Sequence, residues 1–312
     1  MITCVTMNTS LDKLYRVGRL DDGTVMRVRE VVNTAGGKGL NVAKVAALLG
    51  EDVAATGFIG GFNGAHVRSL LAETGIADAF VESGVETRAC INVIDDETGT
   101  STEFLEPGPA VAEERYDEFL ARYGELVTAS DAVTISGSLP TGAPDGFYGR
   151  LVAVANAAGK PVVLDTSGRL LRDGVASHPT LIKPNQDELG QLTQREIHGE
   201  AEIVATVRGL VSGGIPHVAA SLGAKGVVFA CADGVFRSRV PDVHAVNPVG
   251  CGDSMVAAFA VGLARHLPIA QMLRLALAVS AASAMDEKTG SFGRDDFESL
   301  SGRVEIERIG DA

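Results

Sequence analysis

The sequence predicts an α/β fold: a doubly wound, mostly parallel sheet with helices on both faces, accompanied by a small β-sheet lid. Short apolar, β-rich runs alternate with segments of helical periodicity along most of the 312 residues, which is the pattern of strand–helix–strand units. Many of the strands end in polar or glycine-rich loops, and ligands of open α/β sheets bind at that edge. Two segments, about 13–34 and 88–106, break the alternation.

We expect one domain over residues 1–312. Its predicted strands are Ile2–Thr6, Val53–Phe58, Ala132–Ser136, Pro161–Asp165, Thr180–Ile182 and His217–Ser221. Its predicted helices are Leu40–Leu49, Ala65–Thr74, Glu113–Val127, Asp145–Ala158, Gln186–Leu192, Glu202–Val211, Ile269–Asp286 and Asp295–Leu300. The last two helices close the core, and we expect the tail after them to be peripheral.

The two interrupting segments predict the lid. Arg88–Ile94 and Thr100–Leu105 form two strands around the turn at 95–99. Tyr15–Thr34 is charged and alternating, without helical periodicity. Neither segment fits a doubly wound core, so we expect them to form a small sheet over the carboxyl edge of the main sheet.

Composition excludes several classes of function. A net charge of −13 disfavours nucleic acid and anionic membranes as partners, and no apolar run has transmembrane length. The 46% hydrophobic content is enough for a large core. The four cysteines lie far apart without a Cys-x-x-Cys pair, which argues against a zinc site or a disulfide framework and predicts a cytoplasmic location.

The most informative stretch runs from Asn247 to Ser254. Gly250 and Gly252 flank Cys251, Asp253 follows, and an apolar helix begins there. Glycine lets backbone amides converge on a ligand, and a helix N-terminus adds unpaired N–H groups and partial positive charge. An anion site beside a carboxylate base suits phosphoryl transfer to an alcohol. The alternative is a turn with an ordinary helix cap.

A second glycine-rich stretch, residues 36–41, carries Gly37, Lys38 and Asn41 at the start of a predicted helix. Leu40 stands where a P-loop has Ser or Thr for magnesium, and the upstream glycine spacing is absent, so we reject a P-loop. The stretch would let a polyol approach the backbone. The alternative is a glycine-rich entry to the helix.

A third stretch, residues 183–188, contains Lys183, Asn185 and Glu188. Asn185 and Glu188 have the spacing of a capping box, which is its structural interpretation. Lys183 could also meet nucleotide phosphates, and Asn185 and Glu188 could hold a hydrated Mg²⁺. The turn at residues 221–226 is compatible with a nucleotide but is weak evidence alone.

Arg27, Arg29 and Arg88 fall in the predicted lid strands. Arg27 and Arg29 are two residues apart, so on a strand they would face the same side. Guanidinium groups over a ligand-binding edge suit phosphate recognition, although an exposed charged side chain is more often simply solvated.

Taken together and in order, these motifs resemble the PfkB (ribokinase-like) family of carbohydrate kinases. Within that family the chain is similar to the phosphosugar branch, which contains tagatose-6-phosphate kinases and 1-phosphofructokinases. The resemblance is carried by residues 8–12, 36–41, 57–61, 86–88, 106–109, 136–140, 165–168, 183–185, 247–253 and 288–290. Asn247-Pro248-Val249-Gly250 and residues 86–88 and 288–290 favour the tagatose-6-phosphate kinases.

The resemblance implies a role for each matching residue. Asp253 would be the catalytic base, and the amides of Gly250, Cys251 and Gly252 would bind the transferred phosphoryl group. The substrate phosphosugar would be held by Asp12, Arg27, Arg29, Gly37, Lys38, Asn41 and Arg88. ATP, the co-substrate, would be bound by Lys183, Asn185, Ser221, Gly223 and Gly226. Mg²⁺, the cofactor, would be bound by Glu188 and, through water, Asn185.

The resemblance also implies a homodimer that forms through the lid. Within enzymes, the alternatives are a 1-phosphofructokinase or a kinase of nucleosides or unphosphorylated sugars; outside enzymes, the alternative is a sugar-phosphate sensor. Lys38 and the three lid arginines argue for an anionic substrate, and the intact Asp253 argues against a sensor. A nicotinamide dehydrogenase is disfavoured because no Gly-x-Gly-x-x-Gly follows the first strand.

Overall fold

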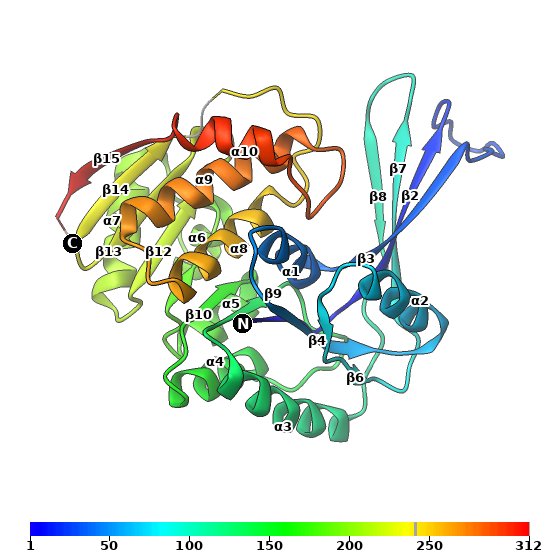
Figure 1. The fold of residues 1–312 in the computed structure, drawn as a ribbon, viewed down its shortest axis with the longest axis horizontal. Coiled ribbons are helices and arrows are strands. Elements are labelled where there is room, and N and C mark those ends of the chain that lie inside the picture. Colours follow the sequence, from blue (N-terminus) through cyan, green and yellow to red (C-terminus); the bar gives the residue numbers. More distant parts are fainter. Residues whose placement is uncertain (240–241, 312) are drawn as a thin grey trace.

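The computed structural model describes residues 1–239 and 242–311. In these residues an eleven-stranded sheet lies between two layers of helices, and a four-stranded sheet projects from one side of this body (Figure 1). The predicted α/β architecture with a separate small sheet is therefore confirmed.

The middle of the main sheet is parallel. β1 (Ile2–Thr6) lies between β4 (Val53–Ile59) and β9 (Ala132–Ser136), and all three run in the same direction. The parallel part continues through β10 (Val162–Asp165), β11 (Leu181–Ile182) and β12 (His217–Ser221) on one side, and through the short β5 (Ala77–Asp78) and β6 (Val81–Glu82) on the other. The carboxyl ends of the central strands consequently share one edge.

Helices cover both faces because successive residues of each strand point to opposite sides. In β10, Val162 and Leu164 pack into one hydrophobic cluster and Val163 into the other. The first cluster also contains residues of α3 (Glu113–Ala129), α4 (Phe147–Ala157), α5 (Gly168–Val175), α6 (Gln186–Thr193) and α7 (Gly199–Ser212). The second contains residues of α1 (Lys38–Leu48), α2 (Gly61–Ala72), α8 (Cys251–Ala264), α9 (Ile269–Met285) and α10 (Arg294–Ser301).

The far end of the sheet differs from the sequence-based expectation. β13 (Val227–Cys231) and β14 (Gly234–Arg239) form an antiparallel hairpin next to β12, and neither strand was predicted. The C-terminal tail, which we expected to be peripheral, forms β15 (Glu305–Gly310) and pairs with β14 at the edge of the sheet. The tail alternates charged and apolar residues, so its strand character depends on the neighbouring edge and not on its own hydrophobicity.

The lid is a sheet in the order β3-β2-β7-β8. Its strands are β2 (Ser10–Val17), β3 (Glu30–Gly36), β7 (Arg88–Asp95) and β8 (Ser101–Leu105). The prediction that Arg27 and Arg29 lie in lid strands is wrong: both lie in the connection from β2 to β3. The charge and alternation of this segment resembled a strand. In the described residues, however, the ladder with β2 begins only at Glu30, and Arg29 makes a single backbone hydrogen bond to Arg16, so the two-residue periodicity does not orient these arginines.

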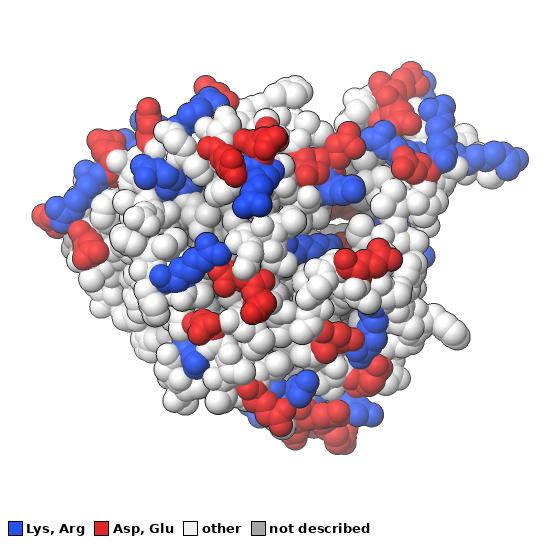
Figure 2. All heavy atoms as spheres, viewed as in Figure 1, with Lys and Arg blue, Asp and Glu red and all other residues white. Residues whose placement is uncertain are grey.

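No helix among the described residues is long and apolar enough to cross a membrane. On the face drawn in Figure 2, acidic and basic side chains are interspersed, without one broad basic surface.

The contact between β1 and β4 predicts one strongly destabilising substitution. Gly57 has φ +147°, and a Cβ there would lie 1.8 Å from the backbone oxygen of Thr6. Gly57→Ala should lower the free energy of unfolding by about 2–3 kcal/mol or more, from backbone strain and displacement of β1. Urea unfolding measures the change. The matched control is Gly209→Ala in α7, where a Cβ meets nothing within 4 Å; a similar loss in both variants would contradict the argument.

Candidate active site

Residues 247–252, here called the anion loop, lead into α8, which begins at Cys251 close to where the sequence predicts a helix. Gly250 has φ +85° and is the N-cap of α8; a Cβ there would lie 2.6 Å from Cγ2 of Thr289. The amide of Cys251 makes a long 3.4 Å bond to the oxygen of Pro248. The next two amides, of Gly252 and Asp253, donate to no backbone oxygen within the described residues. These two N–H groups at the positive end of α8 can bind an anion.

Asp253 lies in the first turn of α8 and is buried, with 6% of its surface exposed. Nδ2 of Asn41, on α1, donates a 2.9 Å hydrogen bond to its Oδ2. Burial, followed by the negative charge of Asp165, raises the pKa of Asp253 to about 6, against the opposing effects of Lys38, Asn41 and Lys183. A carboxylate with this pKa is ionised at neutral pH and remains able to accept a proton.

Two lysines from different elements meet at Asp165, the last residue of β10. Nζ of Lys183 lies 3.1 Å from Oδ1 of Asp165, and Nζ of Lys38, on α1, lies 3.7 Å from Oδ2. A Cβ on Gly252 would be 3.3 Å from Nζ of Lys183, so this ammonium group faces the anion loop. The attraction of Asp165, then that of Asp253 and Glu188, raises the pKa of Lys38.

The junction between the lid and α1 needs glycine. Gly37 has φ +109° and is the N-cap of α1. A Cβ on Gly36 would lie 2.0 Å from the carboxyl carbon of Asp12, which lies in the neighbouring strand β2, two residues beyond Ser10, the partner of Gly36. Asp12 accepts a 2.6 Å hydrogen bond from the hydroxyl of Ser10, and burial raises its pKa. Gly36 therefore makes room for a carboxylate at the foot of the lid, near the positive charges of Lys44 and Arg88.

The three predicted phosphate-binding arginines are not gathered in one place. Arg88, at the start of β7, donates hydrogen bonds to the backbone oxygens of Asn8 and Glu106. Arg27 is exposed, and Arg29 pairs with Asp96 at 3.5 Å on the projecting part of the lid. Only Arg88 stands at the foot of the lid, beside the Asn8 turn that leads from β1 to β2.

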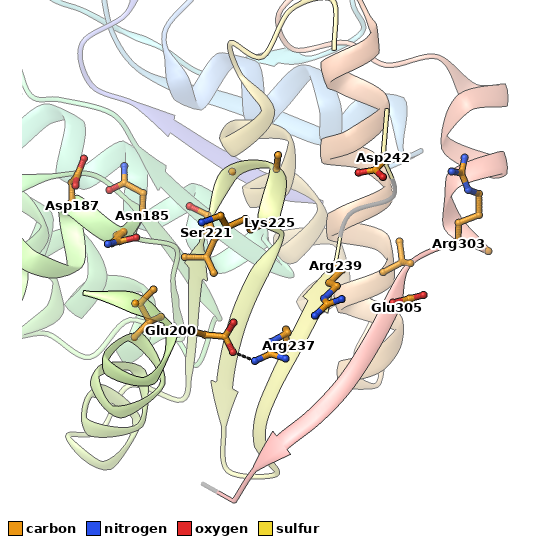
Figure 3. Close-up of a pocket in the computed structure, with 18 residues that line it drawn as sticks. Asn185, Asp187, Glu200, Ser221, Lys225, Arg237, Arg239, Asp242, Arg303 and Glu305 are labelled. Carbon is orange, nitrogen blue, oxygen red and sulfur yellow. Dashed lines mark ion pairs between the residues drawn. The ribbon is translucent and has the colours of Figure 1, made fainter. Parts of the chain in front are cut away.

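The predicted nucleotide side opens into a cavity of about 1350 Å³ (Figure 3). Asn185, Ser221 and Gly223 line it, together with Lys225 and Arg239. Gly226 supports the same turn from behind: its φ is +91°, and a Cβ would lie 2.0 Å from the oxygen of Ser238 in β14. Figure 3 shows the ion pair between Arg237 and Glu200 at the far end of the cavity.

Asn185 and Glu188 form the predicted capping box at the start of α6. Glu188 N donates to Oδ1 of Asn185 at 2.8 Å, and Asn185 N donates to Oε2 of Glu188 at 2.9 Å. No group of three His, Cys, Asp or Glu side chains in the described residues is arranged to hold a metal ion. Mg²⁺ commonly takes one or two carboxylates and fills its other positions with water and phosphate, so the second oxygen of Glu188 fits a hydrated ion that arrives with a nucleotide.

Sequence analysis missed two charged residues of this site. Asp165 was recognised as the end of a strand and as part of the motif at residues 165–168, but no role was assigned to it. Lys44, on the polar side of α1, donates a 2.6 Å hydrogen bond to the oxygen of Ala35 in β3. Burial lowers the pKa of Lys44, while Asp12 and Asp253 oppose the shift. Nothing in its local sequence marked this lysine.

The family model for pfkB family carbohydrate kinases matches residues 5–294. The chain belongs to this family. It is therefore an enzyme, a phosphotransferase with an alcohol group as acceptor. The recognition made from the ordered motifs is confirmed, and so is the preference for an enzyme over a sensor.

Solved structures of pfkB-type kinases are similar over nearly the whole chain. Phosphofructokinase-2 from Escherichia coli, in complex with potassium, has a TM-score of 0.91 at 29% identity, covering 97% of this chain and 98% of that one. A putative phosphofructokinase from Staphylococcus aureus has a TM-score of 0.87 at 29% identity, covering both chains fully. A possible 1-phosphofructokinase from Thermotoga maritima has a TM-score of 0.88 at 25% identity, covering 99% of each chain.

Replacing the candidate base tests the geometry of the anion loop. Asp253→Asn should lower kcat about 10²–10⁴-fold, because the amide cannot accept the proton of the attacking hydroxyl. Binding of the acceptor, measured by calorimetry, should change little since the side chain keeps its shape. Asp173→Asn, on the surface of α5, is the control. A variant at 253 that keeps most of its kcat would show that this residue is only part of the helix cap.

The raised pKa of Asp253 predicts how kcat/KM changes at acid pH. Its pKa is raised to about 6, so it is ionised above that pH and protonated below it. The kcat/KM of the unmodified enzyme should therefore fall about tenfold for each unit below pH 6. A profile that is flat down to pH 5 would exclude Asp253 as the group that takes the proton.

Proposed function

We propose that this enzyme transfers the γ-phosphoryl group of ATP to a hydroxyl of a ketohexose monophosphate, giving the bisphosphate. The observation that carries the proposal is the buried Asp253 beside the free amides of the anion loop, with Lys38 and Lys183 at the same place. Phosphoryl transfer depends on positioning and on charge stabilisation, and this arrangement supplies both.

In the proposed reaction, Asp12 and Asn41 orient the sugar so that one hydroxyl points to Asp253. This carboxylate takes the hydroxyl proton while the oxygen forms a bond to the γ-phosphorus. The bond from the γ-phosphorus to the bridging oxygen breaks, and ADP leaves with its electron pair. The amides at the start of α8 and the two lysines stabilise the negative charge of the phosphoryl group in transit.

ATP fits the cavity beside Asn185, Ser221 and Gly223, with its phosphates toward Lys183. Mg²⁺ would be held by Glu188 and, through water, by Asn185. When bound, the ion would neutralise charge on the phosphate oxygens. These residues would orient the nucleotide, while Lys183 and the anion loop would meet its terminal phosphate.

An anionic acceptor is supported by the cations at the foot of the lid. Arg88 uses three of its N–H groups on backbone oxygens, and a guanidinium group has five. Two donors therefore remain for a phosphate. Lys38, half-exposed and next to Asp165, is the second cation within reach of the same space.

Tagatose 6-phosphate is the acceptor we propose first, because of Pro248 and the motifs at residues 86–88 and 288–290. Fructose 1-phosphate is the alternative, favoured by the similarity to a possible 1-phosphofructokinase. Fructose 6-phosphate is a third, because one similar structure is phosphofructokinase-2 in complex with fructose-6-phosphate. These acceptors differ at single carbons, so the choice rests on contacts finer than the shared motifs.

We also propose that two copies of the chain pair through their lids. β3 and β8 are the edge strands of the lid, and such edges tend to be covered by a partner. Val31, Val32, Phe104 and Leu105 on these strands are all exposed. A pair of lids would cover this apolar surface and would bring Arg27 and Arg29 of one copy toward the site of the other. A similar structure is described as the tetrameric form of phosphofructokinase-2.

A panel of acceptors tests the proposed function. We expect the highest kcat/KM with tagatose 6-phosphate, a lower value with fructose 1-phosphate, and negligible turnover of fructose and ribose under the same Mg·ATP. A neutral sugar leaves Arg88 and Lys38 without an anion, which weakens transition-state binding. A coupled assay for ADP measures all five sugars, including fructose 6-phosphate. A free sugar at the top would refute the phosphosugar acceptor; fructose 1-phosphate at the top would refute only the choice among phosphosugars.

Arg88→Ala tests whether Arg88 binds the phosphosugar and not ATP. The KM for the phosphosugar should rise about 10–100-fold, because a charge-assisted contact contributes about 1.5–3 kcal/mol. The KM for ATP should change by less than about threefold. Arg115→Ala, at a partly solvent-exposed side chain of α3, is the control. Equal effects on both KM values would mean that Arg88 serves only the turn at Asn8.

The lid pairing is tested by Phe104→Glu. The added charge on an apolar contact surface should shift a dimer toward monomer at micromolar concentration, as measured by sedimentation velocity. Glu97→Lys, at the exposed turn of the lid, is the comparison. A protein that is monomeric before any substitution would exclude this pairing.

A further inference from the structure

Asp165 is a charged residue of the site to which the proposed chemistry gives no role. It ends β10 near the middle of the main sheet, and only 2% of its side chain is exposed. Its backbone is fixed on the neighbouring loop, since its oxygen accepts a hydrogen bond from Gly137 N at 2.9 Å. The hydroxyl of the next residue, Thr166, donates to the oxygen of Gly137 at 2.8 Å. The carboxylate therefore points into the site from a rigid support.

The two lysines on Asp165 come from separate parts of the chain. Lys38 begins α1, and Lys183 follows β11. Apart from Asp165, the described structure gives neither ammonium group another carboxylate within 4.0 Å. Two like charges this close repel each other unless an anion lies between them. Asp165 is thus the group that allows both lysines to occupy the edge of the anion loop.

The geometry is incomplete without a ligand. Oδ2 of Asp165 is buried and has no hydrogen-bond partner in the described residues. At 3.7 Å, Lys38 is close enough for an ion pair with this oxygen but not for a good hydrogen bond. Because Lys38 is half-exposed, an ion pair with such a contact adds little to stability. The arrangement is better explained by a function in which Lys38 is held loosely and can contact a ligand.

We propose that Asp165 is a positioning residue of the transfer step. It holds Lys38 and Lys183 beside the anion loop, where both ammonium groups can bind a phosphoryl group that enters the loop. This inference rests on the proposed phosphoryl transfer. When the phosphoryl group arrives, each ammonium group can donate to a phosphate oxygen while it stays beside Asp165, because an ammonium group has three N–H donors. The lysines then need no large rearrangement, because they already stand beside Gly252.

Asp165 also acts on the base through space. Its charge is the strongest that raises the pKa of Asp253, after the effect of burial. The other groups that face Asp253 are Lys38, Asn41 and Lys44 on α1 and Lys183 at the end of β11, and Glu188 acts on Lys38. Removing the negative charge of Asp165 leaves the cations, so the pKa of Asp253 must fall.

The test compares Asp165→Asn with the surface control Asp173→Asn. We expect kcat to fall about 10–100-fold in Asp165→Asn, in line with misplaced catalytic groups. The acid limb of its kcat/KM profile should move to lower pH than in the unmodified enzyme. A residue that only supported the fold would change the thermal transition without moving this limb. A kcat within twofold of the unmodified enzyme, or an unmoved limb, overturns the proposal.

A double-mutant cycle with Lys183→Met shows whether Asp165 works through the lysine. If it does, the fold-decrease in kcat of the double variant is much smaller than the product of the fold-decreases of the two single variants. Fold-decreases that multiply independently overturn the proposal. If Asp165→Asn has no cooperative thermal transition, the cycle is run with the charge-retaining Asp165→Glu, and the same comparison decides.

The variants of the cycle are measured by turnover and by nucleotide binding. The two measurements distinguish failure of the role given to Asp165 from failure of the proposed function. Turnover uses whichever acceptor the unmodified enzyme phosphorylates best. Calorimetry with a non-hydrolysable ATP analogue reports the nucleotide contact of Lys183 without any sugar. An unmodified enzyme that turns over no phosphosugar contradicts the proposed acceptor, whereas an active enzyme with equal affinity for the analogue in Asp165→Asn contradicts the role of Asp165.

Discussion

Two buried carboxylates, Asp165 and Asp253, are the constraint on which this site depends. A buried charge is costly unless cations or hydrogen bonds compensate it. Lys38 and Lys183 compensate Asp165, and Asn41 donates directly to Asp253. The compensation is incomplete, so the pKa of Asp253 is raised to about 6. In the proposed reaction, this incomplete balance lets the carboxylate act as a base and leaves the lysines able to bind a phosphate.

The parallel sheet brings these groups together. β1, β9, β10 and β11 run in the same direction, so the loops after them meet at one edge. Asn8, Asp165 and Lys183 are far apart in the chain. Asn8 follows β1, Asp165 is the last residue of β10, and Lys183 follows β11. The helices α1 and α8 then direct their N-terminal turns to the same edge, where Gly37 and Gly250 adopt backbone conformations with positive φ. Function therefore concentrates where the topology converges.

The lid joins this edge through a tight contact and not through a flexible linker. Gly36 lies against Asp12, and Lys44 ties Ala35 of β3 to α1. Arg88 ties the start of β7 to the turn at Asn8. Movements of the lid would therefore be transmitted to Asp12 and to the cations at its foot. The proposed pairing of two lids would cover the exposed apolar residues on its outer strands.

The sequence by itself determined the elements that carry their own local signals. Hydrophobic periodicity located the central strands, including Ala132–Ser136 and His217–Ser221 with the bounds observed, and glycine spacing located the starts of α1 and α8. The ordered motifs identified the family. Tertiary structure alone decided what depends on a partner far away in the chain: β15 is a strand because β14 offers an edge, and Arg27 lies in a connection because no strand pairs with it in the described residues. It also decided that Asp165 lies between Lys38 and Lys183, since electrostatic contacts across 127 and 18 residues leave no trace in local sequence.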